Sequence, residues 1–135
     1  MTDFPPLDEA ALARLVDHFY ARVRPDPALG PVFEAAVHDW DEHTRRLVAF
    51  WSSVALGTRS YRGNPMAAHR GLPGLDAALF RRWLALWRES TAELLPPPHA
   101  AALLDYAQRI ATSLQYGLGL DPRRTRPLDL PVLGG

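Results

Sequence analysis

Histidines are the side chains of this chain best suited to binding a metal or moving a proton, and two of the five stand out. His69 lies in "NPMAAHRGLPG", between Pro65 and a Gly-Leu-Pro-Gly breaker, which leaves room for about one or two helical turns. A short segment of this kind fixes the position of a side chain without burying much surface. That arrangement suits a histidine that binds the metal of a bulky group. His43 lies beside Leu47 and Phe50 on the apolar face of a predicted helix.

A zinc site is poorly supported. Zinc requires several closely arranged ligands, whereas this chain has no cysteine and no His-x-x-x-His pair. "HDWDEH" contains His38 and His43 with acids between them, but their spacing places them on different parts of a helix. We assign His38 no role, and we expect His18 and His99 to face solvent.

These residue types fit a binding site for a planar macrocycle better than they fit a zinc site. One neutral imidazole can hold haem iron and leave the opposite face open to a small gas or peroxide. Haem also requires apolar walls, polar groups over the open face and cations for its propionates. The chain supplies arginines near His43 and these wall candidates: Phe19, Tyr20, Phe33, Leu47, Trp51 and Trp83. The alternative is that the same side chains are ordinary core, and periodicity alone favours that alternative.

Helices must position these residues, because apolar side chains recur at three- and four-residue steps through most of the chain. Four main helices are predicted: residues 9–23 after the cap Asp8, residues 39–57 ending at Gly57, one starting near Asp76 and one after "LPPPH". "RPDPALGPVF" and "TRSYRGNPMAAHRGLPG" are predicted to be irregular. No segment alternates like a strand, so we expect an all-α domain over residues 1–120 and a flexible tail over 121–135.

Composition narrows the classes of partner. The chain has 135 residues, 47% of them hydrophobic, and a formal net charge of zero, which gives no reason to expect nucleic acid or an anionic membrane surface. All fifteen basic residues are arginine. The absence of cysteine excludes disulfides, iron–sulfur ligation and thiolate chemistry. The start does not resemble a signal peptide and no apolar run is long enough for a membrane span, so we expect a cytoplasmic protein.

Several motifs together resemble one family, the group III (P-type) truncated haemoglobins of bacteria. They are "HFYARVRPDPALGPVF", "DWDEHTRRLVAFWSSVALGTRSYRGNPMAAHRGLP", "FRRWLALWRES" and "RIATSLQYGLGL", in this order over roughly residues 10–120. The resemblance implies a truncated globin fold, in which two helices cross two others around haem b. The sequence departs from the family pattern at Arg70, where we expect an apolar residue such as leucine.

The resemblance also implies roles for four polar residues. His69, in the segment "PMAAH", would be the proximal iron ligand. Tyr20 would direct its hydroxyl at the bound ligand from the distal side, and Trp83 would place its indole N–H beside that ligand. His43 would stand at the distal entrance, where it would act as a gate.

Further haem contacts follow from the same resemblance. Phe19 and Leu47 would wall the distal pocket, and Phe33 would pack near the haem edge. Arg46, one helical turn beyond His43, is the candidate partner for a propionate. Met66 would contact haem from the segment that carries His69.

The functional expectation is a haem protein that binds oxygen or related small ligands at five-coordinate iron. An alternative is a nitric oxide dioxygenase or a peroxidase. Either enzyme would need a separate reductase or other electron donor, because the chain has no glycine-rich dinucleotide turn. A haem-free helical interaction module and a gas sensor without its output domain are the remaining alternatives. The sequence leaves the physiological ligand and the oligomeric state open.

Overall fold

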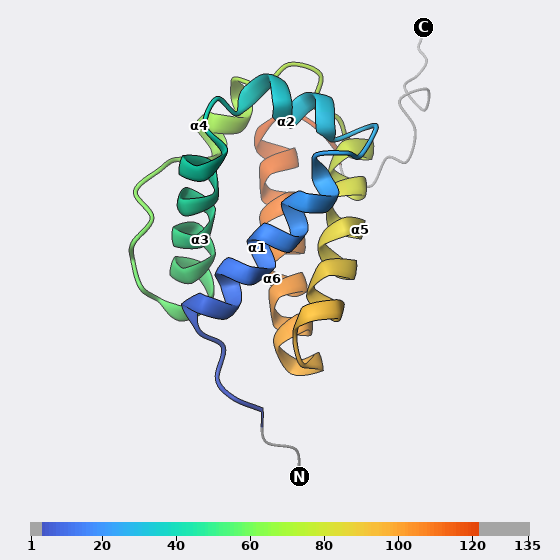
Figure 1. Cartoon of the computed structure of the whole chain (residues 1–135). Helices are drawn as coiled ribbons and strands as arrows, with labels where there is room; N and C mark the ends of the chain where they lie inside the picture. Colours follow the sequence, from blue (N-terminus) through green and yellow to red (C-terminus); the bar gives the residue numbers. More distant parts are fainter. Residues whose placement is uncertain (1–3, 122–135) are drawn as a thin grey trace, which may run out of the picture.

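The computed structural model describes residues 4–121, and α-helices dominate this part of the chain (Figure 1). No strand occurs within these residues, so the prediction of an all-α fold is confirmed. Within the same residues, no helix is both long and apolar enough to cross a membrane. The predicted tail lies outside the described residues, apart from Asp121. The helices are α1 (Glu9–Val23), α2 (Gly30–Ala36), α3 (Trp40–Leu56), α4 (Pro65–Arg70), α5 (Ala77–Leu94) and α6 (Pro97–Gly117).

Local capping explains why three of the long helices begin where the sequence predicts. Asp8, Asp39 and Asp76 each accept a hydrogen bond from the backbone N–H three residues further on, at 2.8, 3.1 and 2.8 Å. These bonds satisfy donors that a helix start would otherwise leave without a partner. Gly57 ends α3 in the left-handed conformation, with φ of 71°. The predicted starts of α1, α3 and α5 and the predicted end of α3 are therefore confirmed.

Two expectations about irregular segments are wrong. α2 begins at Gly30, inside the stretch of residues 24–33 predicted to be irregular, and continues to Ala36. α6 begins at Pro97 rather than after the proline run. Prolines lie in the first turn of both helices. A first-turn residue has no intrahelical partner for its N–H, so proline is tolerated there and does not break the helix.

The helices pack as two crossing pairs. α1 packs against both α3 and α5, and α5 runs antiparallel to α6 beside it (Figure 1). One stripe of α1 is fully buried at this crossing and includes Leu12, Leu15 and Phe19. Stacked indoles connect α3 to α5: the ring of Trp87 lies 4.5 Å from that of Trp51 and 5.6 Å from that of Trp83.

A buried carboxylate connects α5 to the turn between α1 and α2. The side chain of Asp26 is only 3% exposed and accepts hydrogen bonds from Arg82 Nε at 2.8 Å and Nη2 at 2.7 Å. Its other oxygen accepts from the backbone N–H groups of Ala28 and Leu29, at 3.1 and 2.9 Å. These hydrogen bonds offset the free-energy cost of burying the carboxylate. The Arg82 hydrogen bond, followed by the two backbone bonds, holds the pKa of Asp26 below its ordinary value against the opposing effect of burial.

Replacing Asp26 with alanine should lower the free energy of unfolding by about 2–3 kcal/mol, because two backbone donors and a charged pair lose their acceptor. Since the folded pKa of Asp26 is depressed, its stabilising contribution is present above about pH 4 and is lost as pH falls through the folded pKa. Asp26→Asn should therefore reduce the dependence of stability on pH in that acid range. Urea unfolding followed from about pH 7 down to about pH 2, which includes the acid range in which the contribution of Asp26 is lost, measures both effects.

The matched control is Asp105→Ala, which removes an exposed α6 ion pair with Arg109. Its expected cost is below about 0.5 kcal/mol, because exposed pairs of this spacing contribute little. Equal losses in the Asp26 and Asp105 variants would contradict the assigned role of Asp26.

Candidate haem-binding site

A cavity of 590 Å³ lies between the helices and is lined from every helix, α1 to α6. Aliphatic and aromatic side chains form most of its wall, and exposed polar residues from the start of α3, among them Glu42 and Arg46, lie at its rim. A cavity of this size and character can take a cofactor. The aromatic lining residues are Phe19, Tyr20, Phe33, Phe50, Trp51, Tyr61, Phe80, Trp83 and Trp87.

His69 reaches this cavity from α4, a helix of only six residues. Asn64 caps the helix by accepting from Ala67 N at 3.1 Å, and Pro65 occupies the first turn. The short helix therefore starts at a well-defined residue, as the breakers on either side of His69 predict.

The tautomer of His69 is set by one hydrogen bond. Its Nδ1 lies 2.7 Å from the carbonyl oxygen of Pro65. Because a carbonyl can only accept, Nδ1 must carry the proton, and in the neutral ring Nε2 keeps a free lone pair. The ring faces that of Phe80, with the two planes inclined by 28° and the centroids 6.3 Å apart. A neutral imidazole with its second nitrogen anchored in this way is the form that binds a metal.

Tyr20 presents a hydroxyl to the same cavity from α1. Its ring is packed edge-on by Phe19 and Phe33, with centroids 5.0 and 5.5 Å away. Within the described residues, no protein group forms a hydrogen bond with this hydroxyl. Burial raises the pKa of Tyr20, because the charged phenolate would lose its hydration. Tyr20 therefore keeps its proton and remains able to donate a hydrogen bond.

His43 lies next to Tyr20 and is enclosed by aromatic rings. Its ring centroid is 5.4 Å from that of Tyr20, 5.6 Å from Trp40 and 6.3 Å from Phe33. The Nε2 atom is buried and has no hydrogen-bond partner. Burial, followed by the positive charge of Arg46, lowers the pKa of His43 below 6.5, so the ring is neutral at pH 7. This nitrogen at the cavity wall is therefore available to form a hydrogen bond with a molecule bound in the cavity.

The rim of the cavity carries a charged pair. Arg46 is 70% exposed, and its Nη2 lies 2.6 Å from Glu42 Oε1, one helical turn earlier. The guanidinium can thus move toward an anionic group at the opening. His38 also lies at this rim, although sequence reasoning assigned it no role.

The structure brings most of the predicted site residues together. The cavity lining includes Tyr20 together with Phe19, Phe33, His43, Arg46, Leu47, His69 and Trp83. Met66 is the exception, because its side chain packs with Phe80, Ala111 and Leu114 beside α6. His18 and His99 also lie apart from the cavity, with hydrogen bonds to Glu93 Oε1 and to the carbonyl of Pro5, both at 2.8 Å.

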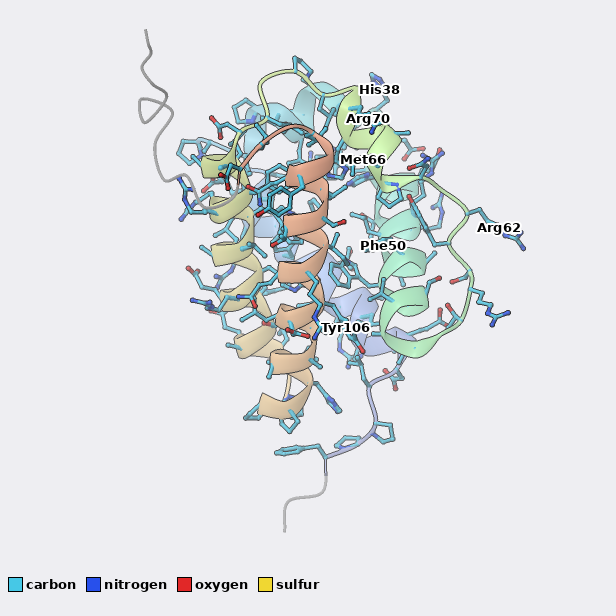
Figure 2. The ribbon with its side chains drawn as sticks, turned by 180° about the vertical axis from the view of Figure 1, so that it is seen from behind. His38, Phe50, Arg62, Met66, Arg70 and Tyr106 are labelled. Atoms are coloured by element: carbon cyan, nitrogen blue, oxygen red, sulfur yellow. The ribbon has the colours of Figure 1, made fainter. Side chains whose placement is uncertain are left out.

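Sequence reasoning missed part of the wall. Tyr61 lies in a segment predicted to be irregular, yet its ring meets Phe50 edge-on at 5.2 Å, whereas the neighbouring Arg62 extends into solvent (Figure 2). Phe80 lies on α5, three residues before Trp83, and also lines the cavity. Periodicity does not distinguish a helix face that meets a cavity from one that meets closed core. The other missed lining residues on α5, α6 and the segment before α5 include Leu72, Leu75, Leu79, Ile110, Ala111 and Leu114.

These features fit haem better than a bare metal ion. Within residues 4–121, no group of three or more histidine or acidic side chains could enclose an ion. Haem iron already has the porphyrin nitrogens as ligands and requires only one imidazole from the protein. His69 can supply that imidazole, the aromatic wall can receive the macrocycle, and Arg46 can meet a propionate.

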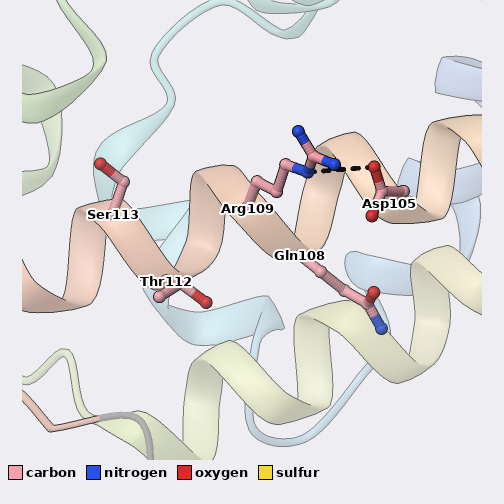
Figure 3. Close-up of a pocket in the computed structure, with 5 residues that line it drawn as sticks. All are labelled: Asp105, Gln108, Arg109, Thr112 and Ser113. Atoms are coloured by element: carbon pink, nitrogen blue, oxygen red, sulfur yellow. Dashed lines mark ion pairs between the residues drawn. The ribbon is translucent and has the colours of Figure 1, made fainter.

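A second hollow, of 440 Å³, lies on the outer face of α6 (Figure 3). All of its lining residues are exposed, and Arg109 pairs there with Asp105 at 3.1 Å. No apolar residue and no buried polar residue lines it, so it is a feature of the surface. The residues are Asp105, Gln108, Arg109, Thr112 and Ser113.

The pKa of His43 should be measurably below 6.5 in the folded chain. Because the unfolded chain takes up this proton more readily, His43 should reduce stability as pH falls from about 6.5 to its folded pKa. Arg46→Gln should raise the pKa only in part, since burial is the larger cause. Titration of the ring protons by nuclear magnetic resonance measures these values, and a His43 pKa at or above 6.5 would contradict the structure.

Comparison with known proteins finds a relative that matches most of the chain. No family model matches. The group 3 truncated hemoglobin ctb of Campylobacter jejuni is 33% identical over 116 residues, which are 83% of this chain and 91% of that protein. The crystal structure of group III truncated hemoglobin from Campylobacter jejuni has a TM-score of 0.81 and 32% identity, and the match covers 87% of this chain and 95% of that one. With this fold, this cavity and this degree of identity, the chain belongs to the group 3 truncated hemoglobins.

Proposed function

We propose that this protein binds haem b in the 590 Å³ cavity, with His69 Nε2 as the protein ligand to iron, and holds oxygen or another small ligand at the remaining position. The observation that carries the proposal is the 2.7 Å hydrogen bond between His69 Nδ1 and the Pro65 carbonyl. It leaves the Nε2 lone pair free at the wall of an aromatic cavity. The names of the two related proteins support the same assignment.

When bound, haem supplies an iron centre that is five-coordinate before a small ligand binds. The chain supplies the hydrogen bonds that hold such a ligand. Tyr20 carries an O–H that burial keeps protonated, and Trp83 carries an indole N–H; both side chains line the cavity. Donors of this kind stabilise a ligand that gains negative charge on binding.

Other residues shape access and orientation. Phe19, Leu47 and Phe33 form apolar walls that exclude water. His43, neutral and half-buried beside Tyr20, would lie between the aromatic interior and the rim and would gate entry. Arg46 would pair with a propionate by moving away from Glu42 or by sharing its guanidinium between the two carboxylates.

The alternative function is turnover of peroxide or nitric oxide with an external electron donor. The neutral His43 with its unpartnered Nε2 favours this alternative, because such a group can accept a proton from peroxide and return it. Turnover measured with a reducing system, compared between the unaltered protein and Tyr20→Phe, separates catalysis from simple binding.

Replacing His69 with alanine should abolish the haem spectrum of the unaltered protein, because within the described residues no other side chain combines a free imidazole nitrogen with this anchor. The measurement is the visible absorption spectrum of the oxidised, dithionite-reduced and carbon monoxide-bound protein. His38→Ala is the matched control, since His38 is an exposed histidine at the rim of the same cavity. An unchanged spectrum in the His69 variant would exclude His69 as the iron ligand.

Removing either proposed donor should accelerate oxygen dissociation. Tyr20→Phe and Trp83→Phe each delete one hydrogen bond worth about 0.5–1.5 kcal/mol, which corresponds to about a two- to twelvefold faster rate. Stopped-flow displacement of oxygen by carbon monoxide measures the rate. Tyr106→Phe is the control, because Tyr106 lies on α6 outside the cavity lining (Figure 2). Dissociation rates equal to that control would show that these groups do not hold the ligand.

A further inference from the structure

Met66 occupies a position that the haem-binding proposal does not use. It belongs to α4, and its thioether lies directly over Gly117, the last residue of α6. A Cβ atom on Gly117 would lie 2.7 Å from Met66 Sδ and closer still to its terminal methyl. Figure 2 labels Met66 where α4 approaches α6. The absence of a side chain at Gly117 therefore leaves the space that Met66 fills.

Backbone conformation does not account for this glycine. Among the described residues, the glycines with positive φ are Gly57, Gly74 and Gly119. Gly117 is not one of them, so an alanine there would meet no backbone strain. The contact that an alanine at this position would disturb is the one with the flexible end of the Met66 side chain.

The Met66–Gly117 contact matters because few other contacts hold α4. The helix has six residues, none of them fully buried, and α6 is its principal helix partner. Met66 connects it to the apolar cluster of Phe80, Ala111 and Leu114. His69 follows Met66 by three residues, less than one turn later on the same short helix. A change in the seat of Met66 should therefore change the direction of the His69 ring.

We propose that Met66, seated over Gly117, is a positioning residue that sets the distance and tilt of α4 relative to α6 and thereby aims His69 Nε2 into the cavity. Met66 acts through His69, because Met66 itself does not line the cavity. The inference rests on the proposed function, because the aim of His69 matters only if this residue binds iron. Methionine suits the task, since its unbranched, polarizable side chain fills an irregular gap.

The experiment compares variants of the haem-loaded full chain in the ferrous, ligand-free state. The readout is the iron–histidine stretching band in resonance Raman spectra, which reports how the imidazole is held. Gly117→Ala displaces the thioether and Met66→Ala removes it, so each should shift or broaden the band. Met66→Leu refills the space with an apolar side chain and should keep the band near that of the unaltered protein.

The matched control is Gly71→Ala. Gly71 is closer to His69 in sequence, but its added Cβ would meet only Ala68 O, at an ordinary 3.8 Å, and its φ of −80° suits alanine. This variant should leave the band unchanged. Circular dichroism establishes that each variant is folded, and the soft torsions of methionine allow the Gly117 variant to fold with Met66 displaced.

A double variant isolates the contact itself. In the Met66→Ala background there is no thioether to displace, so adding Gly117→Ala should cause no further shift. An unchanged band in Gly117→Ala, an equal shift in Gly71→Ala, or the same Gly117 effect in both backgrounds would overturn the inference and leave haem binding intact. Absence of any iron–histidine band in the unaltered protein would instead overturn the proposed function, and this inference with it.

Discussion

The edge-on packing of Phe19 against the tryptophans of α5 is the interaction on which the rest of the structure depends. The Phe19 ring lies 5.4 Å from Trp83 and 5.0 Å from Trp87, nearly perpendicular to both. Such contacts add to the stabilisation from burial of apolar area. They hold α1 on α5 at the point where closed core gives way to cavity. Trp87 also stacks on Trp51, so the same cluster fixes α3. A large cavity can persist because the rings around it are held by rings behind them.

Tyr20 and His43, beside the cavity, are neutral, whereas a buried carboxyl away from the cavity is charged. Near the cavity, burial keeps Tyr20 protonated and His43 neutral, because neither has a partner that would stabilise its charged form. Away from it, Asp26 is as buried as Tyr20 but remains charged, because Arg82 and two backbone donors surround its oxygens. The first arrangement leaves hydrogen-bonding groups available to an occupant. In the second arrangement both carboxylate oxygens of Asp26 accept hydrogen bonds, and these bonds connect α5 to the chain between α1 and α2.

The segment that carries His69 shows how a short helix can hold a functional side chain. Asn64 and Pro65 define where α4 begins, and the Pro65 carbonyl fixes the ring tautomer one turn later. These interactions lie within α4 and its cap, so the tautomer of the His69 imidazole does not depend on a tertiary contact. The placement of α4 in the molecule is a separate matter, and packing on α6 decides it.

The sequence by itself determined the features that depend on neighbouring residues. Asp8, Asp39, Asp76 and Gly57 act within a turn of their own position, so the limits they set for α1, α3 and α5 were predictable. The short segment around His69 was predictable for the same reason. Only the tertiary structure decided what depends on distant residues. It brought Tyr61 to the cavity wall and placed Met66 against α6 instead of in the cavity lining. The starts of α2 and α6 have a local cause, because proline is tolerated in the first turn of a helix. Periodicity shows that a face is buried, but the packing of helices far apart in the sequence decides whether that face meets closed core or an open cavity.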